Sequence, residues 1–436
     1  MDAILQHPLA IARFLHGLSQ RDLAEGIRQA ARRRDRMAGT TKQQVSVWER
    51  GRVPDAWYQR LIADVFGVDL DHVTALGWPY WLPGNEAPQP LDAGATVVAL
   101  REAHRRAMLN RRSIFGLAPV ALVTLAQQWA TLDAAPPAKT LTGTSVDPDF
   151  VDWLERSVPH LTGMATADRE RAVPLLNSFY ETVVGLLDNA CYDEKTGTRL
   201  YALASSLGQT IGWYRFDHED HRSAGHYWAA SLDASRRAGD TDRGAGILAD
   251  ISYQSIWLGQ AGLAVNILDL ALRRAQDPTA RSLLHLRRAR ALAMGGDARA
   301  CRRALDAAEH ALDTARTPPP AWCSWYSTAD IAVDSGRCLI DLGETGPALA
   351  QITQGVADLP GARDKTRSVF LAYEAEALLR QGEIDHSAAS AHEALVLAKK
   401  IGASRCIRQI SDFAPGFEAH RQVQGVQQLL NAVRAA

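Results

Sequence analysis

Apolar residues recur at helical spacing through most of this chain, and beyond Pro148 no segment alternates between apolar and polar positions as a strand would. Near the N-terminus, Leu23 and Ile27 lie on one apolar stripe, and Val45 and Trp48, three residues apart, lie on another. The pattern therefore predicts an all-α protein whose first eighty residues contain short helices.

More helices are predicted after these two. Short helices are expected over residues 55–66 and 69–76, with Gly67 between them. A basic helix is expected over residues 97–110, and a buried helix with a basic lead-in should end near Ala126.

Residues 39–51 combine the features of a DNA recognition helix. Thr41 is a suitable N-cap, and Gly51 can end the helix in the left-handed conformation. The side chains left facing outward are Lys42, Gln43, Ser46 and Val47. Gln can bond adenine in a bidentate way, Lys can reach guanine, and a Val methyl can pack on thymine. An ordinary amphipathic surface helix is the alternative.

The surrounding residues resemble the Cro/repressor-type (Xre) helix-turn-helix family. The matching residues are Leu18, Ser19, Gln20, Leu23, Ala24, Thr41, Gln43, Val45, Trp48, Glu49 and Gly51, followed by Phe66, Gly67 and Val68. The resemblance implies five short helices, a phosphate contact for Gln20, and base contacts for Lys42, Gln43 and Val47. One departure is that residues 28–39 are long and basic where the family has a tight turn. Either the second helix is extended or a loop is inserted, and docking on DNA would then differ.

Charge placement favours DNA as the partner, although the chain has a formal net charge of −1. Residues 28–60 contain nine basic residues and only three acidic ones. A basic run beside a recognition helix suits phosphate contacts, and a solvated surface is the alternative. The candidate DNA-contacting residues are Gln20, Arg32, Arg33, Arg34, Thr41, Lys42, Gln43, Ser46, Val47 and Arg50.

Length and composition indicate a normal globular protein of two or three domains, since 47% of its 436 residues are hydrophobic and 22% are charged. Pro- and Gly-containing breaks at residues 77–84 and 134–138 suggest the boundaries. We expect a helix-turn-helix domain over residues 1–77, a linker with one or two helices over 78–147, and a helical repeat domain over 148–436.

The last of these regions repeats. Turns at Glu219, Gly259, Gly296, Gly343 and Gly382 recur at intervals of about 37 to 47 residues. A small residue precedes each turn by seven positions, as at Gly212 and Gly336, and an apolar plug usually follows by nine. This register resembles a degenerate tetratricopeptide repeat, which implies an α-solenoid of stacked helix pairs.

The same register implies that the first helix of each pair lines a concave groove. The candidate groove residues are Trp213, Tyr253, Trp257, Arg290, Arg337, Asp341 and Glu376. Aromatic rings beside two arginines suit an apolar ligand that carries a carboxylate or phosphate. Alternatively, these side chains form salt bridges with one another and pack against a partner subunit.

Enzyme chemistry has little support. His218, His221 and His226 lack the i, i+4 spacing of a zinc-binding helix, and no phosphate-binding loop, nucleophile elbow or dinucleotide fingerprint occurs. We therefore expect no catalytic residues, no metal and no cofactor. Five cysteines without a C-x-x-C pair, and no secretory signal or membrane span, favour a reduced cytoplasm.

A helix-turn-helix followed by tetratricopeptide repeats resembles peptide-pheromone regulators of Gram-positive bacteria, and many Ala- and Arg-rich regulators that look actinobacterial. The pheromone receptors clamp peptides with groove asparagines, which the predicted groove positions here do not contain. We expect a cytoplasmic, homodimeric transcription regulator that binds a palindromic operator. A peptide, a small acidic molecule or a protein would bind the repeats as its signal. The alternative is a tetratricopeptide interaction scaffold with an accessory DNA-binding domain.

Overall fold

The computed structural model describes residues 8–436 except 17, 69, 71, 72, 75–77, 80, 83–90, 92–94, 110–116, 118, 135, 136, 138, 139, 141, 142, 165 and 362. The described residues are helical with connecting loops and contain no strand, which confirms the all-α prediction. The chain divides into two compact units, residues 1–88 with 117–122, and residues 89–116 with 123–436.

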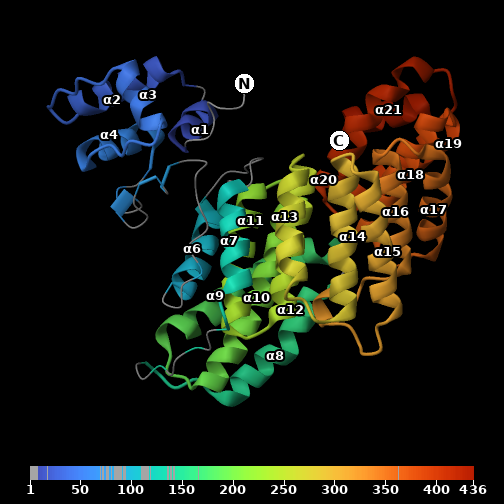
Figure 1. Cartoon of the computed structure of the whole chain (residues 1–436), viewed down its shortest axis with the longest axis horizontal. Coiled ribbons are helices and arrows are strands. Elements are labelled where there is room, and N and C mark those ends of the chain that lie inside the picture. The colour runs from blue at the N-terminus through green and yellow to red at the C-terminus, as the bar shows by residue number, and fades with distance from the viewer. Residues whose placement is uncertain are drawn as a thin grey trace. The chain divides into compact units, whose positions relative to one another are not determined.

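The first unit contains four described helices (Figure 1): α1 (Pro8–Leu15), α2 (Gln20–Arg32), α3 (Lys42–Glu49) and α4 (Ala56–Phe66). The helix expected over residues 55–66 is present as α4: Asp55 caps it, and Gly67 ends it with a φ of 67°. The helix expected over residues 69–76 lies largely outside the described residues. Leu23, Val45 and Leu61 pack together in the core, so the predicted apolar stripes form it.

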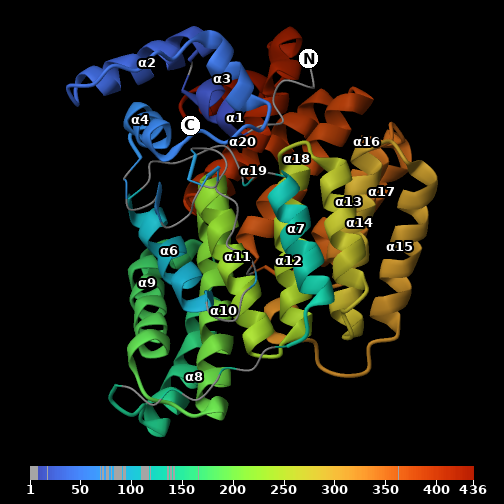
Figure 2. The same cartoon turned by 60° about the vertical axis from the view of Figure 1, so that its left-hand side comes forward.

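Two helices lie in the region that the sequence assigned to a linker: α6 (Thr96–Leu109), in the second unit, and α7 (Pro119–Thr131), whose residues from 123 onward belong to that unit. They are followed by α8 (Pro148–Thr162) and α9 (Thr166–Asn189), which lie in the predicted repeat domain. Figure 2 shows α6 lying along α9 and α11 (His221–Arg237). Thr96 Oγ1 donates to Asp233 Oδ2 at 2.6 Å, and His104 Nδ1 lies 2.8 Å from the Tyr227 hydroxyl. These buried contacts place α6 in the core of the second unit rather than in a linker.

Five helix hairpins follow and stack side by side as a solenoid (Figure 1). Each hairpin consists of two consecutive helices. The pairs are α10 (Glu194–Asp217) with α11, α12 (Thr241–Trp257) with α13 (Ala261–Leu272), α14 (Pro278–Met294) with α15 (Ala298–Asp313), α16 (Thr328–Asp341) with α17 (Thr345–Asp358), and α18 (Asp364–Gln381) with α19 (Ile384–Lys400). The chain then ends with α20 (Ser404–Phe413), a 3-10 segment (Ala414–His420) and α21 (Val426–Arg434).

The repeat register predicted from the sequence agrees with these hairpins. Each predicted turn contains a residue of positive φ, from 60° at Glu219 to 85° at Gly382. The longest interval, between the turns at Gly296 and Gly343, contains an inserted 3-10 turn (Ala321–Cys323). Trp322 in that turn packs against Gly246 of α12, where an added Cβ would lie 2.5 Å from the indole.

Gly336 provides a test of the hairpin packing. A Cβ at this position would lie 2.5 Å from Ile352 Cγ1 and 2.8 Å from the Ala348 carbonyl oxygen, and backbone cannot rotate away. We expect Gly336→Ala to lower the free energy of unfolding by about 1–3 kcal/mol through overpacking. Thermal unfolding would measure the change. Gly346→Ala, where an added Cβ meets no described atom within 4 Å, should be neutral or slightly stabilising.

Two further observations concern expectations about cysteines and membranes. The five cysteines form no disulfide, and four of them are buried while Cys191 is half-buried. Of the helices that the structure describes, none combines the length and the apolar character needed to cross a bilayer.

Candidate functional site

Helix α3 is positioned by the residues that the sequence singled out. Thr41 caps it, with Oγ1 accepting a bond of 3.3 Å from the Gln44 backbone N–H. Val45 and Trp48 are buried, and the Trp48 ring lies 5.2 Å from that of Tyr58 on α4. Anchored on this side, α3 exposes the opposite side to solvent.

The outward face of α3 carries the predicted base-contacting side chains. Lys42, Gln43 and the following Arg50 are exposed, whereas Ser46 and Val47 are half-buried. An exposed lysine and glutamine on one capped helix can donate and accept hydrogen bonds at base edges.

Gln20, at the start of α2, is already engaged within the protein. Its amide Nε2 donates to Glu49 at the end of α3, and Arg13 Nε lies 2.6 Å from the other oxygen of that carboxylate. Because an amide nitrogen has two N–H groups, Gln20 retains one with which a phosphate could be bound. The Ser19 capping box fixes its backbone.

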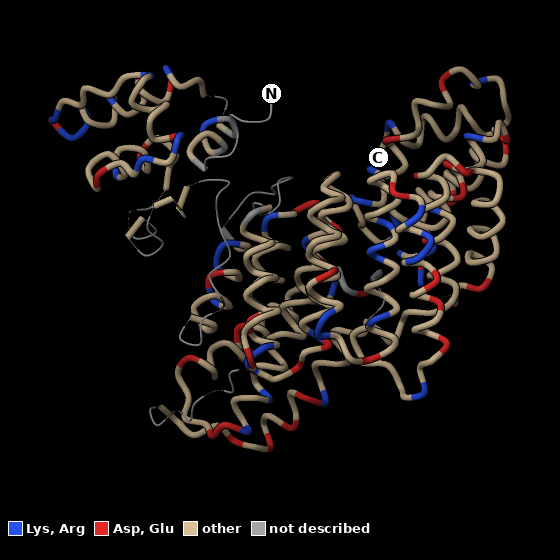
Figure 3. The backbone as a smooth tube through the Cα atoms, viewed as in Figure 1, with Lys and Arg blue, Asp and Glu red and all other residues tan. Residues whose placement is uncertain are grey.

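The long basic segment after α2 combines both conformations that the sequence left open. Helix α2 extends to Arg32, and a loop follows over residues 33–41, in which Asp35 has a φ of 52°. The Arg28 guanidinium donates to the Thr40 carbonyl oxygen and thereby ties α2 to the end of the loop. Figure 3 shows the basic positions gathered at this end of α2.

The arginines of this segment differ in their roles. Arg34 bonds Asp64 of α4 through two contacts of 2.8 Å, and Arg36 lies 5.0 Å from the centre of the Trp57 ring. These two arginines therefore hold the loop against α4. The side chains of Arg32 and Arg33 are exposed beside them, so they are the better candidates for phosphate contacts.

In the second unit, the first helices of the hairpins, together with α20, bring charged and aromatic side chains together. We call this set the inner cluster: Asp217, Tyr253, Arg287, Arg290, Asp334, Arg337, Asp341, Lys365, Tyr373, Glu376 and Arg405. It contains five of the seven predicted groove residues. The other two, Trp213 and Trp257, lie at its edge, with Lys365 4.5 Å from the Trp213 ring and Arg405 4.5 Å from the Trp257 ring.

The predicted arginine pair converges, as the repeat register implied. The guanidinium carbons of Arg290 and Arg337 lie 5.1 and 5.0 Å from the centre of the same Tyr373 ring. Each arginine also has carboxylate partners within the chain. Arg290 Nη1 lies 2.6 Å from Asp334, whereas Arg337 bonds Glu376 and, at 2.8 Å, Asp341. The salt-bridged alternative thus describes the arginines in this structure.

Asp217 connects the first hairpin to the end of the solenoid. Lys365 Nζ on α18 lies 2.6 Å from its Oδ2, and Arg405 Nη2 on α20 lies 3.2 Å from its Oδ1. The Arg405 guanidinium also lies 4.8 Å from the Phe216 ring. Only 3% of the Arg405 side chain and 4% of the Asp217 side chain is exposed, so this pair is desolvated.

Two pKa shifts describe the electrostatics of this region. Burial raises the pKa of Asp250 to about 7, although Gln209 donates a 2.8 Å hydrogen bond to its carboxylate. Burial also acts to raise the pKa of Tyr253, but the positive charges of Arg405 and Arg287 outweigh it and lower that pKa below its ordinary value. The surroundings of Tyr253 are therefore electropositive.

Sequence reasoning missed several members of the inner cluster, namely Arg287, Asp334, Lys365, Tyr373 and Arg405. Three of them, Arg287, Asp334 and Tyr373, had a usable signal, since each precedes a predicted groove residue by three positions and so shares its helix face. Lys365 and Arg405 had none, because they reach Asp217 from 148 and 188 residues away.

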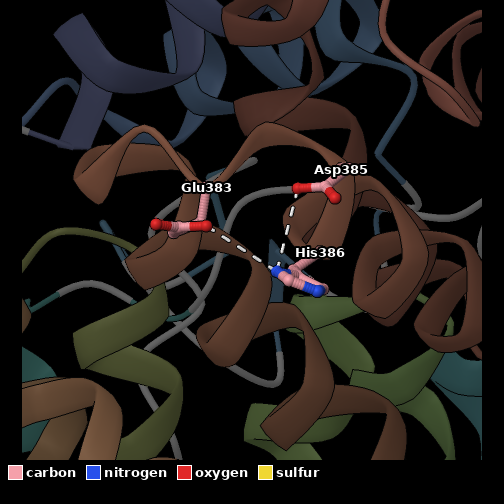
Figure 4. A group of neighbouring side chains, drawn as sticks. All are labelled: Glu383, Asp385 and His386. Carbon is pink, nitrogen blue, oxygen red and sulfur yellow. Dashed lines mark ion pairs between the residues drawn. The ribbon is translucent and has the colours of Figure 1, made fainter.

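The histidines considered as metal ligands have other contacts. His218 Nδ1 lies 2.9 Å from the Tyr214 carbonyl oxygen, and His221 lies 3.4 Å from the Gln254 amide. Among the described residues, one group has metal-ligand spacing: Glu383, Asp385 and His386 (Figure 4). All three side chains are exposed, and the His386 ring lies 3.7 Å from both carboxylates, so ion pairing accounts for the group.

Comparison with known proteins adds no relative. No family model, no curated protein and no solved structure matches this chain.

Proposed function

We propose that this protein is a sequence-specific DNA-binding regulator of transcription. Its first unit would act as a helix-turn-helix domain of the Cro/repressor type, with α3 in the major groove. The observation that supports this most is α3 itself, which is capped by Thr41, anchored by Val45 and Trp48, and exposes Lys42 and Gln43. Gln43 would read adenine and Lys42 would read guanine.

The remaining DNA contacts would position the protein rather than read sequence. Arg32 and Arg33 would bind phosphates beside the groove, and Gln20 would contribute its remaining N–H group. A single module of this size contacts few base pairs, so we propose a homodimer on a palindromic operator. Light scattering together with the symmetry of the selected site would test this.

The second unit would act as the sensor, with its tetratricopeptide-like hairpins binding a ligand or protein that changes operator affinity. The interaction scaffold with an accessory DNA-binding domain remains the competing function. Selection of bound sites from random DNA, followed by gel shift, separates the two. A saturable, sequence-selective complex is expected for a regulator, and purely non-selective binding would favour the scaffold.

Arg33→Ala tests the phosphate contacts. Removing one contact should weaken specific and non-specific binding together and make the salt dependence of log K shallower by about one unit. Binding measured across a salt series would give this slope. Arg302→Ala is the control, because it removes the same charge from the second unit, and it should leave the slope unchanged. Equal slopes for Arg33→Ala and wild type would contradict the contact.

A further inference from the structure

The inner cluster contains buried donors that its own carboxylates do not satisfy. Nη1 of Arg405 and Nε of both Arg290 and Arg337 are buried and find no hydrogen-bond partner among the described residues. Arg405 is 2% exposed and Arg290 is 5% exposed, so neither guanidinium reaches bulk solvent. Leaving such charged donors without an acceptor is unfavourable, because the hydrogen bonds that they lose to water on burial are not replaced.

Arg290 and Arg405 each lie close to one of two tyrosines, whose charges act on one another. Arg405 is 5.7 Å from the Tyr253 ring, and Arg290 Nη1 is 3.3 Å from the Tyr373 hydroxyl. Arg290 also contributes to lowering the pKa of Tyr253, after the larger effects of burial, which acts in the opposite direction, and of Arg405. The positive charges of both arginines therefore act on Tyr253.

The charge balance of the cluster is also incomplete. Arg287, Arg290, Arg337, Lys365 and Arg405 are cationic, and the carboxylates within bonding distance of them are Asp217, Asp334, Asp341 and Glu376. Glu376 is further shared with Arg380. Asp250 is a further carboxyl group on which the charges of Arg287 and Lys365 act, and burial raises its pKa to about 7, so it does not supply a full negative charge at neutral pH. Buried water would satisfy the donors but would leave this positive excess, whereas an anion offsets both.

We propose that the inner cluster binds a small oxyanion, a carboxylate or phosphate group, between Arg290 and Arg405 beside Tyr253 and Tyr373. Arg405 Nη1 and Arg290 Nε donate to the oxyanion, while Asp217 and Asp334 keep the other sides of the two guanidinium groups. This site rests on the proposed function, for which it supplies the chemical class of the signal.

The full-length protein is titrated with inorganic phosphate and, separately, with acetate, against sodium chloride at matched ionic strength. We expect at least one oxyanion to raise the melting temperature in a saturable way, and the tyrosine absorbance titration to shift to higher pH as the anion offsets the charges around Tyr253. Stabilisation by phosphate alone would identify a phosphoryl group as the ligand, and stabilisation by acetate alone would identify a carboxylate. Stabilisation no greater than that by chloride overturns the proposal.

Arg405→Lys assigns the site. Lysine keeps the charge beside Asp217 but loses the planar fork and the free Nη1 donor, so the variant should fold. We expect it to bind the oxyanion about tenfold or more weakly, the loss of one charge-assisted hydrogen bond. Arg408→Lys is the control, since Arg408 lies on the same helix but is exposed and pairs with Glu219. Equal losses in both variants would place the anion elsewhere.

The same protein is then tested for operator binding with and without the effective oxyanion. Anion binding without any sequence-selective DNA complex would leave the site standing and remove the regulator function. A sequence-selective DNA complex without anion binding would leave the regulator function standing and remove the anion site.

Discussion

Asp217→Asn is expected to lower the free energy of unfolding by about 3–5 kcal/mol, the range for breaking one side of a buried ion pair. The substitution keeps the size of the side chain but removes the negative charge between Lys365 and Arg405. The Arg405 guanidinium would then be buried among aromatic rings without a counter-charge. Urea unfolding of the two proteins at the same pH measures the difference.

Glu219→Gln provides the matched control for this prediction. Glu219 pairs with Arg408 at 3.0 Å across the same two helical regions, but more than half of the Arg408 side chain is exposed. Exposed pairs contribute about 0.2–1 kcal/mol, so this variant should change stability little. Similar losses of stability in both variants would show that the buried Asp217 ion pairs contribute no more to the free energy of unfolding than the exposed pair does.

Gln43→Ala is expected to cost about 1–3 kcal/mol of specific DNA binding while leaving non-specific affinity intact. The exposed Gln43 amide lies on the first turn of α3, where a recognition helix contacts base edges, and alanine cannot form the bidentate bond. Competition gel shifts at fixed salt, with the selected operator and with scrambled DNA, would separate the two affinities.

Gln29→Ala is the appropriate comparison, because Gln29 is an exposed glutamine on α2, outside the predicted reading face. It should bind the operator as wild type does. Wild-type operator binding by Gln43→Ala would mean that α3 does not enter the major groove through this face.

Local elements of the fold could be predicted from the sequence because their causes lie within a few residues. Ser19, Thr41 and Asp55 each accept a backbone N–H three residues on, so short-range contacts fix the starts of α2, α3 and α4, and an apolar stripe was enough to indicate these helices from the sequence. The turns of the hairpins were equally local, since Gly382 and its equivalents adopt positive φ.

The interior of the second unit could be predicted only in part, because its partners depend on how the hairpins curve. The register placed Arg290 and Arg337 on one face, but their shared ring, Tyr373, belongs to a third helix. Arg405 lies on a helix beyond the repeats, where a buried arginine has no sequence signal. Likewise, nothing local showed that Arg34 pairs with Asp64, which lies 30 residues further along the chain.

The contacts of Asp217 change how this solenoid should fold and unfold. In an open repeat array each hairpin touches only its neighbours, so stability is nearly a sum over nearest-neighbour terms and the ends can fray independently. Here Asp217 bonds Lys365 and Arg405, which lie 148 and 188 residues further along the chain. The unfolding of the first hairpin is therefore coupled to that of the last. Closing so long a loop costs entropy before any contact compensates for it, which favours slow, late formation of this contact. Once formed, the contact couples the two ends, and removal of either terminal hairpin should destabilise the whole array.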